Sequence, residues 1–184
     1  MAELVYSMIM SADGYLNDAN GGYDFAMPSD EVFAETLVLA RETTLDIMGR
    51  RMYDEMAIWD EWIEHEQQDL RDYARAWADG DKIVVSHTIA EPRTARTRVV
   101  PELTVADVLR LKGEYDGRIA ISGPTLAAPF IRAGLIDEFQ LWAAPVLVGG
   151  GTRVLPDGVR LDLELLESKA YADGMTYARY RPRR

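Results

Sequence analysis

Residues 117–148 read GRIAISGPTLAAPFIRAGLIDEFQLWAAPVLV, and this stretch predicts a strand, a helix and a second strand in succession. The first run is short and apolar, and it stops at Gly123 and Pro124. Pro124 suits the first turn of the helix that follows, and Gly134 suits the position after its end. Apolar residues then return over residues 135–148, which predicts the second strand.

The same alternation of strands and helices runs through the preceding part of the chain. Strands are predicted at residues 4–10, 46–48, 82–86 and 96–100, and helices are predicted after Ser29 and over residues 50–56, 66–78 and 104–115. Thr104 with Asp107 three residues later resembles a capping box at the start of the last of these helices. In the C-terminal part, two runs flank Asp173 and Gly174 and predict an antiparallel hairpin.

This order of elements predicts an α/β fold with a central, mostly parallel sheet. Helices would cover both faces of the sheet, and the C-terminal hairpin would form an antiparallel edge. The chain has 184 residues, and no stretch rich in proline, glycine and serine divides it. We therefore predict a single domain over residues 1–184.

Composition and charge exclude several classes of site and partner. The chain has no cysteine, which rules out disulfides, thiolate metal ligands and a cysteine nucleophile. Its two histidines, His65 and His87, fit no metal-ligand spacing, and we expect no metal. The formal net charge of -11 repels a nucleic-acid backbone. No apolar run approaches the ~20 residues of a membrane span, and the first residues read as a strand and not as a signal peptide, so we expect a cytoplasmic protein without a membrane partner.

Short polar segments follow the predicted strands. They are SADG at residues 11–14, GRR at 49–51, SHT at 86–88 and SGPT at 122–125. Ligands of such sheets bind beyond the carboxyl ends of the strands, and guanidinium, hydroxyl and backbone N–H groups suit nucleotide phosphates. Taken singly, each segment is also explained as a turn with surface ion pairs or ordinary capping. No G-x-G-x-x-G follows a strand, so a dinucleotide would not use the Rossmann fingerprint.

Five segments together carry a family resemblance. They are SADGYL, MGRRMY, KIVVSHT, ISGPTLAAPFIRAGLIDEFQLWAAPVLVGGGTRVLP and the closing hairpin. In this order they resemble the stand-alone reductases related to the C-terminal domain of the bifunctional riboflavin-biosynthesis deaminase-reductase. The resemblance covers nearly the whole chain and implies a three-layer dihydrofolate-reductase-like fold, NADPH as cofactor and a homodimer. It also implies hydride transfer to a C=N or C=O of a small heterocyclic substrate, of ribosylamino-pyrimidine or pterin type.

The resemblance also implies which residues bind the cofactor. The turn that holds the cofactor phosphates would be Gly49, Arg50 and Arg51. The loop on the adenosine side would be Ser86, His87 and Thr88. The turn against the pyrophosphate and the nicotinamide ribose would be Ser122, Gly123, Pro124, Thr125 and Leu126. Two positions depart from the family pattern, because Met52 stands where Thr is usual and Asp54 where Glu is usual.

A hydride transfer also needs a proton source and a pocket for the substrate. Two acids are candidates for the catalytic proton. Asp30, at the start of a predicted helix, resembles the pterin-binding carboxylate of dihydrofolate reductases, and Asp13 lies in the SADG turn. Each is also explained as a first-turn acid or as a turn residue that bonds its own backbone. Aromatic and apolar residues could line a pocket for a planar substrate, although residues of this kind more often belong to an ordinary core. These residues are Tyr15, Leu16, Phe33 and Trp59.

Alternatives to this function stay open. A true dihydrofolate reductase would need a base for the glutamate tail of its substrate, for which Arg71 and Arg75 are candidates. The riboflavin-pathway reductase itself would need cations for a phosphorylated substrate near the GGGTR segment, where Arg153 is the one obvious member. A dimeric nucleotide-binding module without catalysis belongs to a different class, and Met52 in place of Thr would fit it. The zinc-dependent deaminase step is excluded because the chain has no H-x-E with P-C-x-x-C.

Overall fold

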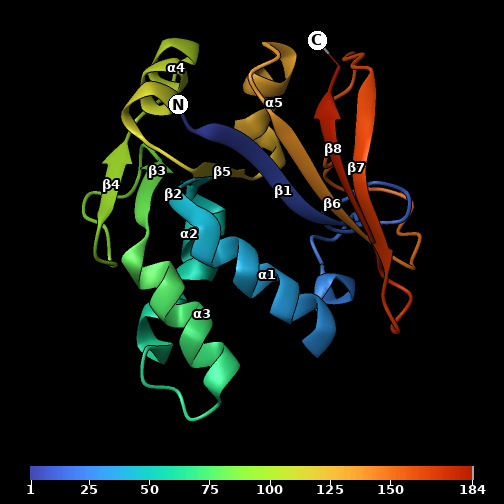
Figure 1. The fold of residues 1–184 in the computed structure, drawn as a ribbon, viewed down its shortest axis with the longest axis horizontal. Helices are drawn as coiled ribbons and strands as arrows, with labels where there is room; N and C mark the ends of the chain where they lie inside the picture. The colour runs from blue at the N-terminus through green and yellow to red at the C-terminus, as the bar shows by residue number, and fades with distance from the viewer. Residues whose placement is uncertain (184) are drawn as a thin grey trace.

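Eight strands form one sheet in the computed structural model, which describes residues 1–183 (Figure 1). In chain order they are β1 (Glu3–Ser11), β2 (Thr43–Gly49), β3 (Asp81–Val85), β4 (Thr97–Val100), β5 (Arg118–Ser122), β6 (Glu138–Ala144), β7 (Leu163–Ala170) and β8 (Thr176–Pro182). The order across the sheet is β4-β3-β2-β5-β1-β6-β8-β7. The strands from β4 to β6 in this order run parallel, and β8 runs antiparallel to β6 and β7. The predicted mostly parallel sheet with a C-terminal hairpin is confirmed.

Helices cover both faces of this sheet (Figure 1). On one face lie α1 (Asp30–Glu42), α2 (Arg50–Met56) and α3 (Gln68–Asp79), and on the other lie α4 (Val105–Glu114) and α5 (Pro124–Arg132). Two short 3-10 helices, η1 (Asp24–Ala26) and η2 (Ala57–Trp62), precede α1 and follow α2. The molecule therefore has three layers.

Local signals place the ends of several helices where the sequence predicts them. The Ser29 side chain accepts a hydrogen bond from the Val32 N–H at the start of α1. Thr104 and Asp107 form the capping box that opens α4. After α5 the chain reverses at Gly134, whose φ of 66° lies in the left-handed region that glycine adopts without strain.

The predicted strand over residues 135–148 is wrong at both ends, because β6 covers only Glu138–Ala144. Before β6, Asp137 exchanges two hydrogen bonds of 2.8 Å with the Leu4 backbone, one of them through its carboxylate. After β6, Pro145 has no N–H to donate to a ladder, and the Val148 N–H donates to the Asp13 carboxylate at 3.2 Å. Apolar composition alone does not show where these backbone groups find their partners.

The two faces of the sheet are packed differently. Against α4 and α5 the buried side chains form one continuous cluster that includes Tyr6, Ile121 and Phe130. Under α1, α2 and α3 the buried side chains divide into two smaller clusters, one with Trp142 and one with Trp77. The space between these two clusters is the pocket described below.

Candidate active site

The carboxyl ends of β3, β2 and β5 lie side by side at one edge of the sheet. In the strand register, Gly49 of β2 stands opposite Val85 of β3, and Met48 stands opposite Ser122 of β5. The segments that follow these strands therefore begin at neighbouring positions along one edge. The structure thus brings together the three segments that the sequence assigns to the cofactor, and their roles in binding stay predictions.

The two arginines after β2 have different surroundings. Arg50 Nη1 lies 3.0 Å from Asp54 Oδ2, and Asp54 Oδ1 also lies 3.1 Å from Arg93 Nη2. Arg51 is exposed and makes no ion pair within residues 1–183. A Cβ atom added at Gly49 would meet no atom within 4 Å, so the turn faces open space. Arg51 is therefore the more available of the two guanidinium groups for a phosphate.

The turn between β5 and α5 also faces open space. Gly123 has a φ of 94°, and a Cβ added there would meet no atom within 4 Å. The α5 helix starts at Pro124, and the N–H groups of Thr125 and Leu126 belong to its first turn, where they have no partner inside the helix. Unpaired N–H groups at the start of a helix favour an anion. This turn fits the phosphate groups of a dinucleotide.

The segment after β3 is held in shape by its own side chains. Ser86 Oγ accepts hydrogen bonds from the backbone N–H groups of Thr88 and Ile89, at 3.1 and 3.2 Å. His87 and Thr88 are exposed. The Ser86 hydroxyl therefore shapes the loop, while the imidazole of His87 is free to meet a ligand.

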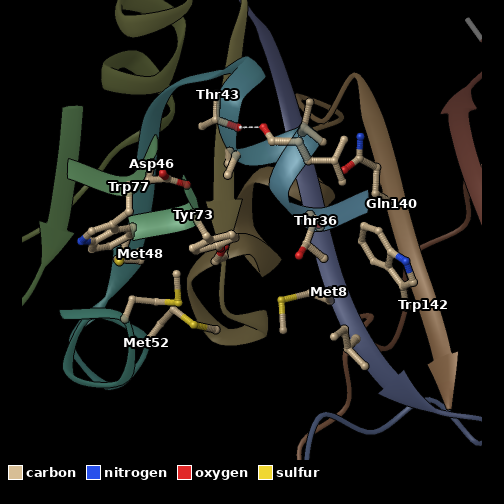
Figure 2. Close-up of a pocket in the computed structure, with 18 of the residues that line it drawn as sticks. Met8, Thr36, Thr43, Asp46, Met48, Met52, Tyr73, Trp77, Gln140 and Trp142 are labelled. Atoms are coloured by element: carbon tan, nitrogen blue, oxygen red, sulfur yellow. Dashed lines mark hydrogen bonds between the residues drawn. The ribbon is translucent and has the colours of Figure 1, made fainter. Parts of the chain in front are cut away.

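A pocket of about 300 Å³ lies between the sheet and the layer of α1, α2 and α3 (Figure 2). Small side chains leave this space open. On the sheet side these are Ser7 of β1 with Ala120 and Ser122 of β5, and on the helix side they are Ala40 and Ala76. With so little side-chain volume, the two layers do not fill the gap between them.

One end of this pocket adjoins the edge where the three segments begin. Its lining there includes Ser122 at the end of β5, Leu16 after β1, and Met52 and Met56 of α2. The lining is largely apolar, and it includes Met48 and Met52 near Trp77 and Met8 toward Trp142 (Figure 2). Methionine side chains adapt to flat ligands of different shape. The arrangement places a largely apolar pocket next to the edge where the three polar segments begin.

Asp46, in the middle of β2, is the acid that lines this pocket. Burial raises its pKa to about 6, and the nearby charge of Lys82 offsets part of this effect. Tyr73 of α3 lies on the same side of the pocket (Figure 2), and burial together with the charge of Asp46 raises its pKa as well. No motif in the sequence marked Asp46 as a site residue. The available signal was an acid between apolar neighbours inside a strand, where unpaired acids are rare.

Of the two acids that the sequence proposes, Asp13 is engaged by the backbone. Its carboxylate accepts hydrogen bonds from Ser11 Oγ at 2.6 Å and from the N–H groups of Val148 and Gly149 at 3.2 and 2.8 Å. These hydrogen bonds lower the pKa of Asp13, and the bond from Ser11 has the largest effect. Asp30 lies in the first turn of α1 and is exposed. Neither residue lines the pocket.

The four residues predicted to contact a planar substrate separate into two groups. Leu16 lines the pocket, whereas Tyr15 packs its ring under the Arg153 guanidinium, 5.0 Å from the ring centroid. Phe33 and Trp59 stack on each other with ring centroids 6.0 Å apart, and both also contact Tyr73. They therefore back the pocket wall and do not themselves line it.

Comparison with known proteins agrees with this architecture. Residues 2–177 match the family described as the RibD C-terminal domain. The chain belongs to the RibD C-terminal domain family. Over 182 residues it is 24% identical to the uncharacterized protein YyaP of Bacillus subtilis, an alignment that covers 96% of this chain and 93% of YyaP.

Two solved structures extend this comparison. A putative riboflavin biosynthesis protein from Shewanella sp. PV-4 has a TM-score of 0.74 and 23% identity, with 100% of each chain covered. A dihydrofolate reductase from Enterococcus faecalis, solved in a complex with NADP(H), has a TM-score of 0.63 and 12% identity over 99% of this chain and 97% of the reductase. These likenesses concern the fold, and they confirm the dihydrofolate-reductase-like fold that the sequence resemblance implies.

The two departures from the RibD C-terminal domain pattern have structural roles here. The Met52 side chain lines the pocket and packs against the buried cluster around Trp77. Asp54 holds both Arg50 and Arg93. Met52 therefore adds apolar surface to the pocket where Thr would place a hydroxyl, and Asp54 restrains one of the two arginines in the turn at residues 49–51.

The three arginines named for the alternative functions already interact with nearby residues. Arg71 Nη1 donates to the carbonyls of His65 and Glu66 at 2.7 and 3.2 Å, and Arg75 Nη2 bonds Glu64 at 3.1 Å. Arg153 Nε lies 3.8 Å from Asp157. Within the part of the chain that the structure describes, no three His, Asp or Glu side chains are grouped as metal ligands, and no helix has the length and apolarity to span a membrane.

Proposed function

We propose that this member of the RibD C-terminal domain family is an NADPH-dependent reductase of a small nitrogen heterocycle of ribosylamino-pyrimidine or pterin type. The reaction would transfer hydride to a C=N or C=O of that substrate. One observation carries the proposal: the pocket on the sheet face adjoins the edge at which three anion-compatible segments begin. Adjacent sites for a dinucleotide and a flat substrate are what such a reaction needs.

The residues at the edge fit NADPH. Arg51 and the first-turn N–H groups of α5 would hold its phosphates, with Arg50 contributing in part, because Asp54 already holds it. Ser86, His87 and Thr88 would face the adenosine side. When bound, NADPH supplies the hydride. The protein supplies orientation and an apolar pocket that limits access of water, which fits the lack of a nucleophile or catalytic triad in the sequence.

Two alternatives are less well supported by the surroundings of the arginines. Arg71 donates to the His65 carbonyl and Arg75 donates to the Glu64 carboxylate. Both arginines are therefore engaged by the segment just before α3, and neither is free to bind the tail of a folate. Arg153 packs on Tyr15 and lies 3.8 Å from the exposed Asp157, so the GGGTR segment offers a single, partly engaged cation for a phosphorylated substrate. The homodimer and the cytoplasmic location stay predictions.

Binding and turnover are tested separately. Two of the four tryptophans, Trp77 and Trp142, line the pocket, so quenching of their fluorescence should report NADPH binding. NADPH oxidation is then followed with dihydrofolate, pterins and ribosylaminouracils as substrates. We expect quenching by NADPH and turnover with at least one heterocycle. Absence of both would refute the proposal, and binding without any turnover would favour the non-catalytic module.

A further inference from the structure

The pocket holds few polar groups, and most of them already have partners. Thr36 Oγ1 donates to the Phe33 carbonyl at 2.8 Å, and Thr43 Oγ1 donates to the Leu39 carbonyl at 2.9 Å. Gln140 Nε2 donates to Glu138 at 2.7 Å. Among residues 1–183, five lining residues have polar side-chain groups that make no hydrogen bond or ion pair within the protein. They are Asp46, Tyr73, Ser7, Ser122 and, through its indole N–H, Trp142.

The pocket interior offers no spare positive charge within residues 1–183. Arg118 is the one cation in its lining, and Arg118 Nη1 lies 3.4 Å from Glu42 and 3.6 Å from Glu138. Lys82 contributes its field to Asp46, but its ammonium group donates to the Gly80 carbonyl at 2.7 Å and lies 4.8 Å from the Trp77 ring centroid. An anionic ligand group would therefore meet Asp46 without a compensating cation.

Asp46 is reachable from the interior because one of its two neighbours across the sheet is small. It pairs with Lys82 of β3 on one side and with Ala120 of β5 on the other, and Ala120 pairs in turn with Val5 of β1. The alanine leaves the carboxylate open to the pocket, and the Tyr73 hydroxyl is the second uncommitted polar group near it. A carboxylate beside a hydroxyl, above an apolar floor, matches the edge of a flat ring that presents adjacent N–H donors.

We infer that Asp46 determines substrate specificity: it accepts hydrogen bonds from the N–H edge of a neutral or cationic nitrogen heterocycle and excludes anionic groups, phosphate included, from the pocket interior. This inference rests on the proposed function for the identity of the pocket as a substrate site. It narrows the substrate class, because any phosphate on the substrate must stay outside the pocket. Asp46 acts here as a binding residue, and no proton transfer is assigned to it.

The test uses calorimetric titration of the full chain with 2,4-diaminopyrimidine, which presents adjacent N–H donors. The same probe is titrated into Asp46→Asn, which keeps the shape of the side chain and removes its charge, and into Asp116→Asn, a matched change at a fully exposed side chain. We expect the Kd to rise at least about tenfold in Asp46→Asn and to stay within about twofold of wild type in Asp116→Asn. No binding to the wild type, or equal Kd values for wild type and Asp46→Asn, would overturn the inference.

A second pair of probes tests the exclusion of anions. Uracil and orotate share one ring and differ by a carboxylate. We expect orotate to bind the wild type at least about tenfold more weakly than uracil, with the difference reduced in Asp46→Asn. Equal binding of both to the wild type would contradict the exclusion. Because all these titrations run without NADPH, they report on Asp46 even if the cofactor fails to bind, whereas NADPH quenching reports on the proposed function alone. A melting curve shows that each variant is folded.

Discussion

The Asp13 carboxylate accepts a 2.8 Å hydrogen bond from the backbone N–H of Gly149, 136 residues further along the chain. The same side chain accepts from Val148, so it joins the loop after β1 to the loop after β6. Nearby, a Cβ on Gly151 would collide with the backbone carbonyl of Asn17, so the two loops touch at a second point. Asp13 therefore holds together the two loops that lie beside the pocket near Leu16.

Removal of this link should loosen both loops. We expect Asp13→Ala to lower the melting temperature by roughly 2–4 °C and to speed hydrogen exchange of the Gly149 amide, because the amide loses its acceptor. Hydrogen exchange read by NMR measures the local effect, and Asp116→Asn serves as the surface control. An unchanged exchange rate at Gly149 would show that the loop is held by other contacts.

Asp46 should make the stability of the protein depend on pH. Its pKa is about 6 in the folded chain against an ordinary value of 3.8, so between these values the folded state binds the proton more tightly than the unfolded state. The free energy of unfolding therefore falls as pH rises from about 4 to about 6, by on the order of 3 kcal/mol at most.

The Asp46→Asn variant separates this effect from those of other groups. We expect it to be more stable than wild type in urea unfolding at about pH 8, where the buried carboxylate is charged, with much less difference at about pH 4.5. The same gain at both pH values would assign the effect to packing and not to ionisation.

The two arginines in the turn at residues 49–51 should contribute unequally to NADPH affinity. Arg50 is held by Asp54 at 3.0 Å, while Arg51 is exposed and unpaired within the described chain. We expect Arg51→Ala to raise the Kd for NADPH by about three- to tenfold and Arg50→Ala to raise it less. Fluorescence titration at two salt concentrations measures both. A larger effect of Arg50→Ala would mean that Asp54 releases it on binding.

NADPH should stabilise the protein more than NADH does. Arg50, Arg51 and the hydroxyl and imidazole groups of Ser86 and His87 are the expected partners of the additional phosphate. We expect a larger rise in melting temperature with NADPH than with NADH at the same concentration, because the ligand that binds the folded state more tightly stabilises it more. Equal rises would argue against a phosphate site at this edge.

A side chain at Gly123 should destabilise the fold, although space for it is available. Its φ of 94° is unfavourable for alanine, so we expect Gly123→Ala to lower the free energy of unfolding by about 1–2 kcal/mol and to weaken NADPH binding. Gly113→Ala is the matched control, because Gly113 lies in α4, has no positive φ and has no atom within 4 Å of an added Cβ. There, alanine should stabilise the helix by up to about 1 kcal/mol. Urea unfolding compares the two variants, and similar effects at both positions would contradict the assigned backbone strain.

The sequence by itself determined the elements whose signals are local. The start of α1 at Ser29, the capping box of α4 at Thr104 and Asp107, and the turn of the C-terminal hairpin depend on residues within a few positions of one another. The α/β class followed from the alternation of these elements. The three polar segments were also visible, because a parallel sheet collects the carboxyl ends of its strands at one edge.

Only the tertiary structure decided where the pocket lies and which acid faces it. β5 enters the sheet between β2 and β1, and this placement sets Ala120 next to Asp46, although the two residues are far apart in sequence. Whether a side chain in a strand is packed or open depends on the volume of such neighbours across the sheet. The sequence therefore predicted Asp13 and Asp30 as candidate acids, whereas the arrangement of the strands exposes Asp46 to the pocket.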